Sequence, residues 1–277
     1  MLSEFLLMEQ HSDAAVIGQS YDIWLVFLSY AVVVFASYTS FHLVERVIAA
    51  SNPAARMKWL VIGAVAMGTG IWTMHFVAML ALEMGYGRTA RYDLLITALS
   101  AVFAMAASGF AFNFVSRKSR GVGRLVLGGT VLGAGIGLMH YTGMAAMRMD
   151  TVIRYDPIWF GASIVVAVLL SCLALRLMSY TVEARENEKP DHRMMTALVM
   201  GLSVTLMHYT GMAATNFLLT GESNAGAPGG LALDDSKLAL IIGVVALVVL
   251  GLSWLVANAE KKRAFNTRNL QSSEQGA

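Results

Sequence analysis

The hexapeptide Met139-His140-Tyr141-Thr142-Gly143-Met144 lies inside a long apolar stretch. It recurs as Met207-His208-Tyr209-Thr210-Gly211-Met212 and, less faithfully, as Met74-His75-Phe76-Val77-Ala78-Met79. An α-helix has about 3.6 residues per turn, so a histidine and the methionine four residues later project from one helix face. Each stretch therefore predicts a helix that presents an imidazole and a thioether to the same neighbour.

The composition indicates a membrane protein. Of the 277 residues, 57% are hydrophobic and only 14% are charged, and the mean hydropathy is +0.61. A helix needs about 20 apolar residues to cross the hydrocarbon core of a bilayer. Seven runs meet this requirement: 23–44, 59–82, 94–115, 125–147, 158–175, 194–219 and 238–258. We therefore expect an all-α fold, a seven-helix transmembrane bundle in a lipid bilayer.

The motifs also indicate an internal repeat. His75, His140 and His208 are 65 and 68 residues apart, the length of two spans with their loops. A fixed period of this kind is typical of repeated structural units. We predict three two-helix repeats, each begun by a motif helix, and one extra N-terminal helix. Aspartates that can cap a helix start precede four spans, in the pairs Tyr21-Asp22, Tyr92-Asp93, Tyr155-Asp156 and Asp234-Asp235.

Lysine and arginine predict the orientation, because cytoplasmic loops are enriched in them. Of the 20 basic residues, fifteen fall in one set of connections and five in the other. This places residues 1–22 outside as an N-terminal segment, residues 23–258 in the membrane and residues 259–277 in the cytoplasm as a polar tail. Acidic residues precede the first span, so we expect that span to remain and not to be a signal peptide. The net charge of +2 gives no indication of nucleic-acid binding.

The three histidines are predicted to meet inside the bundle. His75 and His140 lie about 10 Å below the predicted outer end of their spans, and His208 lies deeper. Buried polar side chains avoid lipid, so these imidazoles should face one another. Imidazole and thioether together suit a soft metal, above all reduced copper. The predicted metal ligands are His75, His140, His208, Met79, Met144 and Met212.

Neighbouring residues in the motifs have weaker predicted roles. Three methionines point about 100° away from their histidines and can line the edge of the site or serve a second ion; they are Met74, Met139 and Met207. Tyr141 and Tyr209 can close the site, and their phenols can donate to a bound ligand. Glu83 is either an acceptor for a ligating imidazole or a surface charge, and His42 is assigned to packing or a hydrogen bond.

Two readings compete for the motifs. In one, the histidines and methionines only pack in the interior, because a single buried histidine is more often satisfied by a hydroxyl or carbonyl than by a metal. The threefold recurrence at similar depth favours the metal site. Gly129, Gly133 and Gly137 form a smooth stripe that predicts close approach of another helix to the fourth span.

The strings Met139–Thr142 and Met207–Thr210, with the degenerate Met74–Val77, resemble the signature of the bacterial MHYT integral-membrane sensor domain. The resemblance covers nearly the whole chain. It implies a sensor in the bacterial cytoplasmic membrane that binds copper near the outer face and detects a diatomic gas such as O2, CO or NO. Family members often carry cyclic di-GMP or histidine kinase domains after the last span. This chain ends about nineteen residues beyond it, so we expect a separate signalling partner protein.

Two other functions use the same residues. In a copper transporter or metal relay, methionines farther inward, at Met67 and Met200, would pass the ion on. In a haem-binding electron-transfer protein, histidines and methionines would be axial ligands. The spans contain no nucleophile constellation, phosphate-binding glycine loop or paired carboxylates, so the sequence does not predict an enzyme.

Overall fold

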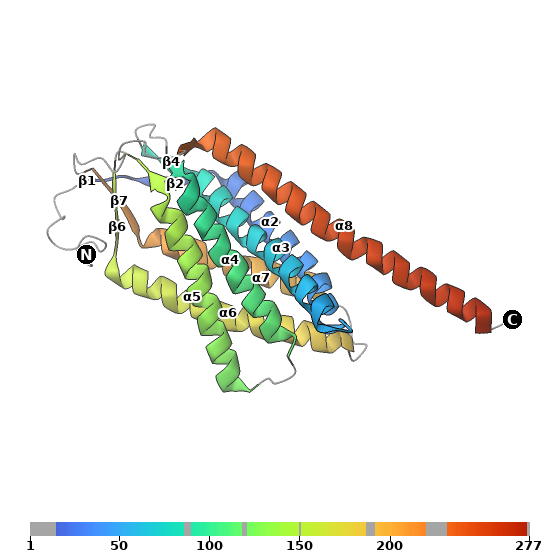
Figure 1. Cartoon of the computed structure of the whole chain (residues 1–277). Helices are drawn as coiled ribbons and strands as arrows, with labels where there is room; N and C mark the ends of the chain where they lie inside the picture. The colour runs from blue at the N-terminus through green and yellow to red at the C-terminus, as the bar shows by residue number, and fades with distance from the viewer. Residues whose placement is uncertain are drawn as a thin grey trace.

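The computed structural model describes residues 15–85, 90–117, 121–149, 151–186, 192–219 and 232–275. Seven helices account for most of these residues (Figure 1): α2 (Ile23–Ile48), α3 (Pro53–Leu80), α4 (Leu94–Val115), α5 (Val122–Ala145), α6 (Pro157–Glu186), α7 (Arg193–Ala213) and α8 (Asp235–Gln275). All of them except α7 are long and apolar enough to cross a bilayer. The predicted all-α transmembrane bundle is confirmed.

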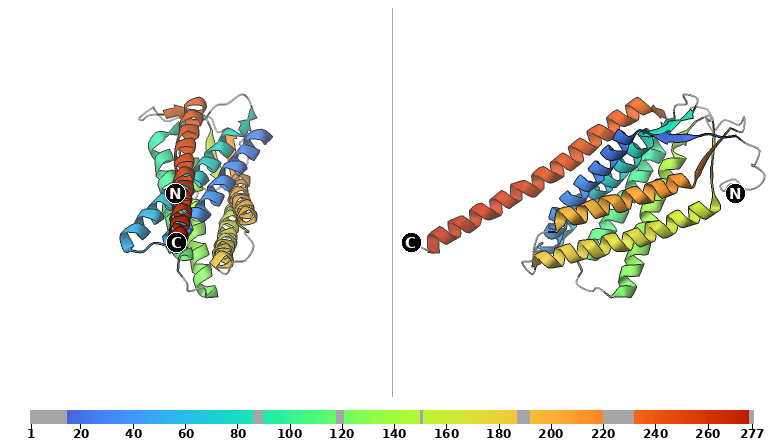
Figure 2. Two further views of the ribbon diagram at one scale, coloured as in Figure 1. Left: turned by 90° about the vertical axis from the view of Figure 1, so that its right-hand side faces the viewer. Right: turned by 180° about the vertical axis from the view of Figure 1, so that it is seen from behind.

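Helices α2 to α7 form a closed ring. Each packs against the next along the chain, α7 packs against α2, and α8 lies outside the ring along α3 and α2 (Figure 2). The sequence predicted that the extra helix would be N-terminal. In the structure this N-terminal helix, α2, completes the ring between α7 and α3, and α8 at the C-terminal end lies outside the ring.

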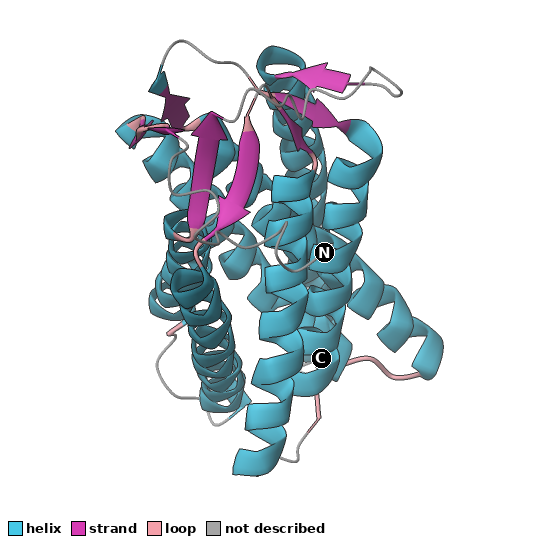
Figure 3. Cartoon of the chain, turned by 90° about the vertical axis from the view of Figure 1, so that its left-hand side faces the viewer, coloured by secondary structure: helices cyan, strands magenta, loops and turns pink. Residues whose placement is uncertain are grey.

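Short strands at one end of the bundle, absent from the sequence prediction, explain this difference (Figure 3). Three small antiparallel sheets have the orders β2-β3, β5-β4-β8 and β1-β7-β6. Their strands are β1 (Ala15–Val16), β2 (Gln19–Tyr21), β3 (Leu82–Met84), β4 (Arg91–Asp93), β5 (Met147–Arg148), β6 (Val152–Tyr155), β7 (Thr215–Leu219) and β8 (Ala232–Asp234). Each motif helix is followed by a strand that pairs with the strand before the preceding helix.

The strand pairings also tie each motif helix to the helix before it, so they group the helices one position earlier than the predicted repeat does. The first unit is β2-α2-α3-β3, the second is β4-α4-α5-β5 and the third is β6-α6-α7-β7. One backbone hydrogen bond closes each unit in the same place: the N–H of Asp22, Asp93 or Asp156 donates to the carbonyl of Ala81, Ala146 or Ala214, at 2.8, 2.9 and 2.8 Å. Strand pairing at one end of the bundle thus joins each motif helix to the helix that precedes it.

The predicted aspartate caps are present. Asp22, Asp93 and Asp156 each accept two backbone N–H groups at the start of α2, α4 and α6. A serine seven residues after each aspartate, at Ser29, Ser100 and Ser163, donates to the carbonyl three residues before it. Asp234 caps α8 through the Lys237 N–H, but Ile241 stands where the serine would be. This difference also separates α8 from the three units.

Two further predictions concern the helix ends and the glycine stripe. The predicted span 194–219 is too long, because α7 ends at Ala213 and the chain continues as β7. Gly129 and Gly133 do face a neighbour: a Cβ there would collide with Cys172 and with the backbone of Ala167 on α6. The most enclosed helix, however, is α3, which has α2 and α4 on its two sides and α8 on its outer face.

Several predicted regions lie outside the described residues. They comprise residues 1–14 of the external segment, with His11, and residues 220–231 of the connection before α8. Within the predicted polar tail, the backbone continues α8 as far as Gln275.

Candidate metal centre

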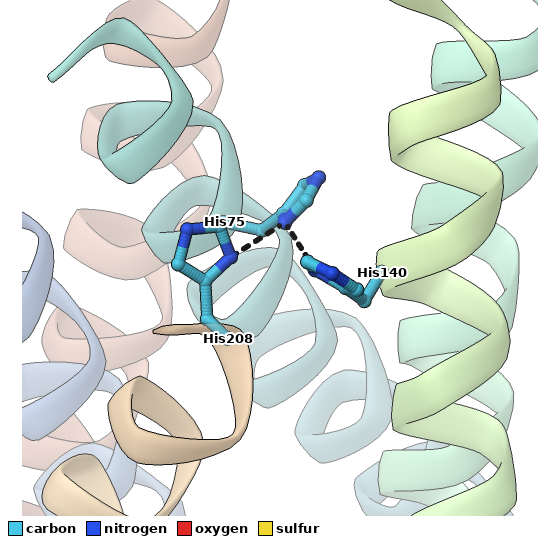
Figure 4. Close-up of side chains that lie close together, drawn as sticks. All are labelled: His75, His140 and His208. Atoms are coloured by element: carbon cyan, nitrogen blue, oxygen red, sulfur yellow. Dashed lines mark hydrogen bonds between the residues drawn. The ribbon is translucent and has the colours of Figure 1, made fainter. Parts of the chain in front are cut away.

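The three motif histidines, one each from α3, α5 and α7, meet inside the bundle (Figure 4). The Nδ1 atom of His75 lies 3.0 Å from Nδ1 of His208 and 3.3 Å from Nδ1 of His140. All three side chains are fully buried, and each can offer one nitrogen within 4.8 Å of the others. His75 is thus the central member of the cluster.

The three histidines lie at the same level of their helices. Each comes five residues before the last residue of its helix: Leu80, Ala145 or Ala213. The sequence placed His208 deeper than the other two, and that was wrong. The error came from extending the sixth span to residue 219, through residues that form β7.

The motif methionines are all buried. Met79, Met144 and Met212 are at most 3% exposed and follow their histidines by one helical turn, which places them toward the end of the bundle that carries the strands. Met74, Met139 and Met207 are equally enclosed, and Met207 lines a cavity of about 20 Å³ between α5, α6 and α7. Their role as ligands stays a prediction.

An aromatic layer covers the histidines on the strand side. The residue after each motif histidine packs edge-on against its own imidazole and against a tyrosine of the next unit. The three ring pairs are Phe76–Tyr92, Tyr141–Tyr155 and Tyr209–Tyr21, with centroids 5.8, 5.2 and 5.4 Å apart. The closing role expected for Tyr141 and Tyr209, with Phe76 in the same place of the first motif, stays a prediction, and the structure adds three strand tyrosines to this layer. The recurring Tyr-Asp pair was the available signal, and only its aspartate was interpreted.

Polar contacts under this layer differ between the units. The Tyr141 hydroxyl and Ser163 Oγ are 2.6 Å apart. Phe76 has no hydroxyl, and the equivalent serine, Ser100, instead accepts a 3.2 Å hydrogen bond from the indole N–H of Trp72. The same indole lies 3.1 Å from the carbonyl of Thr97. Trp72, which lies inside its span, thus takes the place of the missing phenol.

Burial changes the acidity of the strand tyrosines. It raises the pKa of Tyr21 to about 12, with a smaller contribution from Tyr209. Burial also raises the pKa of Tyr92, where Asp235 adds to the effect, and the pKa of Tyr155, where Tyr141 adds to it. These phenols stay neutral at physiological pH, so the layer carries no charge from them above the site.

Other residues singled out in the sequence lie elsewhere. Glu83 is exposed on β3, where it accepts from Ser20 Oγ at 3.4 Å, so it is a surface charge. His42 lies toward the opposite end of α2 and contacts Arg193 Nη1 at 3.0 Å. Arg193 also pairs with Glu45 at 3.1 Å. The predicted hydrogen-bonding role of His42 is confirmed.

Comparison with known proteins supports the repeat predicted from the sequence, in which each unit begins on a motif helix. The MHYT family, described as a bacterial signalling protein N terminal repeat, matches residues 68–128 and 133–187. The chain belongs to the MHYT family. Each match begins on a motif helix and contains one histidine motif. The third motif lies in α7, outside both matches.

MHYT relatives among curated proteins are signalling proteins. Two come from Pseudomonas aeruginosa: the bifunctional diguanylate cyclase/cyclic di-GMP phosphodiesterase MucR, 39% identical over 92% of this chain, and the cyclic di-GMP phosphodiesterase NbdA, 36% identical over 88%. The signaling protein YkoW of Bacillus subtilis is 30% identical over 92%. The chain spans 36%, 30% and 31% of these relatives. No solved structure matches. The chain is thus a multi-pass MHYT signalling domain.

Proposed function

We propose that this MHYT domain is a sensor that holds copper between His75, His140 and His208 and detects a diatomic gas at that ion. The observation that carries the proposal is the convergence of three buried Nδ1 atoms from three different helices. Buried polar groups inside a membrane bundle face one another, and a metal ion at this point would bind all three Nδ1 atoms at once.

The spacing from His75 to each of the other two histidines fits a single ion. Metal–imidazole bonds of about 2.0 Å in a tetrahedral site place two nitrogens about 3.3 Å apart. The Nδ1 atom of His75 lies 3.3 Å from that of His140 and 3.0 Å from that of His208, and the nitrogens that the three rings can offer all lie within 4.8 Å of one another. The same spacing is too small for a haem, whose macrocycle would have to lie among these rings. The geometry therefore favours a metal ion over the haem alternative.

Charge favours the reduced state of copper. Among the described residues, no carboxylate or thiolate joins the three histidines. A doubly charged ion with only neutral ligands is costly in an apolar interior, and a singly charged ion costs less. Imidazole and thioether ligands prefer Cu(I). Met79, Met144 and Met212, one turn beyond the histidines, are the thioethers we assign to it.

Signal output follows from the packing of the ligand helices. Copper held by these histidines would supply a binding position for O2, CO or NO, and a bound gas would shift the balance between two arrangements of α3, α5 and α7, which carry the ligands. Because α8 packs along α3 and extends beyond the bundle (Figure 1), it carries the change to a signalling partner. The relatives' names suggest a partner activity that makes or breaks cyclic di-GMP. We place α8's distal end in the cytoplasm and the strands outside the bacterial inner membrane.

Metal analysis of purified protein tests the proposal. Protein expressed with added copper should contain about one copper per chain, and His140→Ala and His208→Ala should each remove most of it. His42→Ala is the matched control, because His42 lies away from the cluster, and should retain copper. Infrared spectroscopy of the reduced protein under CO should show a copper carbonyl band. Wild-type protein without copper, or copper that survives both substitutions, would overturn the proposal.

A copper relay is the second candidate. Met67 and Met200 are buried two turns farther inward than His75 and His208, so thioethers continue along two of the three helices. Right-side-out vesicles or proteoliposomes loaded with a copper chelator distinguish the two functions. Copper entry that depends on His140 and Met200 supports the relay, and retention of copper without transport supports the sensor.

A further inference from the structure

Two glycines of the motifs hold the histidines of neighbouring helices. A Cβ at Gly143 on α5 would collide with Nε2 of His75 from α3 and lie 2.9 Å from its Cδ2. A Cβ at Gly211 on α7 would collide with Nε2 of His140 from α5 and lie 2.8 Å from its Cδ2. Each imidazole edge thus occupies the space that a side chain of the next motif helix would fill.

The orientation of each ring follows from this contact. The Nε2 atoms of all three histidines are buried and without a hydrogen-bond partner in the described part of the chain. The Nδ1 atoms face the centre of the cluster (Figure 4). For His75 and His140, Nε2 lies against glycine backbone, where a metal ion has no room. Only Nδ1 is left to bind one.

We infer that Gly143 and Gly211 are positioning residues of the metal centre, which fix His75 and His140 so that Nδ1 is the ligating nitrogen. The identity of the metal-binding nitrogen rests on the proposed copper site. The contact of each imidazole with the glycine of the next motif helix, which we call the seating of the ring, rests on the structure alone. The first motif has Ala78 at the corresponding position. The glycines are therefore required by two particular imidazoles and not by the repeat itself.

Thermal unfolding of the metal-free protein in detergent tests the seating. Gly143→Ala should lower the melting temperature by about 5 °C, because the added methyl group overpacks a rigid site. The same substitution in a His75→Ala background should have almost no effect, since the colliding ring is gone. In a His140→Ala background the loss should remain, although His140 is only three residues away on the same helix.

Gly211→Ala provides the mirrored test. His140→Ala should suppress its effect, and His208→Ala should leave it unchanged. Gly137→Ala is the matched control on α5, because a Cβ there meets only Ile164 Cδ1 at 3.8 Å, an ordinary contact. It should leave the melting temperature the same or raise it, as alanine favours a helix over glycine. If Gly143→Ala does not fold, recovery of folded protein in His75→Ala/Gly143→Ala gives the same answer.

Ligation is tested on the copper-loaded protein. Gly143→Ala and Gly211→Ala should weaken Cu(I) binding at least tenfold, measured by chelator competition, while Gly137→Ala should not. Nitrogen-15 NMR of histidine-labelled protein should show metal-shifted Nδ1 and protonated Nε2 for His75 and His140.

The outcomes separate the two proposals. If wild-type protein binds no copper but Gly143→Ala and His75→Ala are still coupled, the proposed function is wrong and the contact between Gly143 and His75 is supported. Protein that binds copper through Nε2, or in which His75→Ala fails to suppress Gly143→Ala, overturns the inference.

Discussion

The motif of the first unit differs from the motifs of the second and third, yet its histidine is the centre of the cluster. Phe76, Val77 and Ala78 replace tyrosine, threonine and glycine, while the Nδ1 atom of His75 faces both other imidazoles at 3.0 and 3.3 Å. The histidine and the two methionines are therefore the constant part of the motif. The other positions are adapted to what each helix meets next to it.

The threonine position supports this interpretation. Thr210 Oγ1 donates to the carbonyl of Leu206 within its own helix, at 2.7 Å. Such a bond serves only the threonine's own hydroxyl, so valine can replace it at position 77 without leaving another group unpaired. The substitution of valine for threonine in the first motif therefore does not indicate that this motif has lost its role.

Removal of the central imidazole should have the largest effect. His75→Ala takes one ligand and also the ring that contacts both other histidines, so we expect copper content to fall below a tenth of the wild-type value. Residues that only orient a metal ligand typically contribute 10–100-fold in affinity, so loss of a ligand itself should cost at least as much. Elemental analysis of purified protein measures this. His42→Ala at full copper content is the control, and a His75→Ala protein that keeps its copper would contradict the central place of the first unit.

Phe76→Tyr tests the adaptation of the first unit directly. Phe76 is fully buried, and the serine that could accept its new hydroxyl is already bonded to the Trp72 indole. A buried hydroxyl without a partner costs about 1–3 kcal/mol. We expect a lower melting temperature in detergent although the motif becomes more regular. A Phe76→Tyr protein as stable as wild type would show that Trp72 does not replace the phenol.

Tyr141→Phe makes the opposite change in the second unit and should cost less. It removes the 2.6 Å hydrogen bond to Ser163, and such bonds contribute about 1 kcal/mol net. The melting temperature should fall by about 2–4 °C for a chain of this size. Ser163→Ala should cost more, because it also removes the hydrogen bond to the Phe160 carbonyl, and the double variant should cost little more than Ser163→Ala alone. Full additivity would mean that the two hydroxyls do not interact.

The spans and the meeting of the histidines were predictable because both follow from local patterns. A long apolar run predicts a membrane span. Polar side chains at similar depth on three helices are expected to contact one another and not lipid. The ring order was not predictable, because it depends on pairing between β2 and β3 and their counterparts. Strands of two to five residues leave little signal beside long helices.

Contacts between units were also beyond the sequence. Gly143 follows His140 by three residues but serves His75, and Gly211 serves His140. The Tyr-Asp pairs were visible, but the tyrosine of each pair contacts the aromatic residue of another unit. When two contacting residues lie on different helices, the local sequence around either one does not predict the contact.

Alkaline titration gives the smallest effect and compares the strand tyrosines of the three units. Burial raises the pKa of Tyr21 to about 12, above the ordinary value of about 10. Between these values the phenol ionises in the unfolded chain and stays neutral in the folded one. Its contribution to stability is therefore complete below pH 10 and is lost as the pH rises toward 12.

Tyr21→Phe should remove part of this alkaline loss, and Tyr92→Phe should remove more. Tyr92 is fully buried and packs against Phe76 of the first motif. Tyr21 is only half-buried beside Tyr209. Melting temperatures recorded from pH 8 to 11.5 measure the difference, and at pH 8 Tyr21→Phe should lose only its hydrogen bond to Gln19. If both variants follow the wild-type curve, the phenols are hydrated and the aromatic layer is open to water. In that case the layer cannot keep the histidine cluster dry, and the preference for a singly charged ion loses its physical basis.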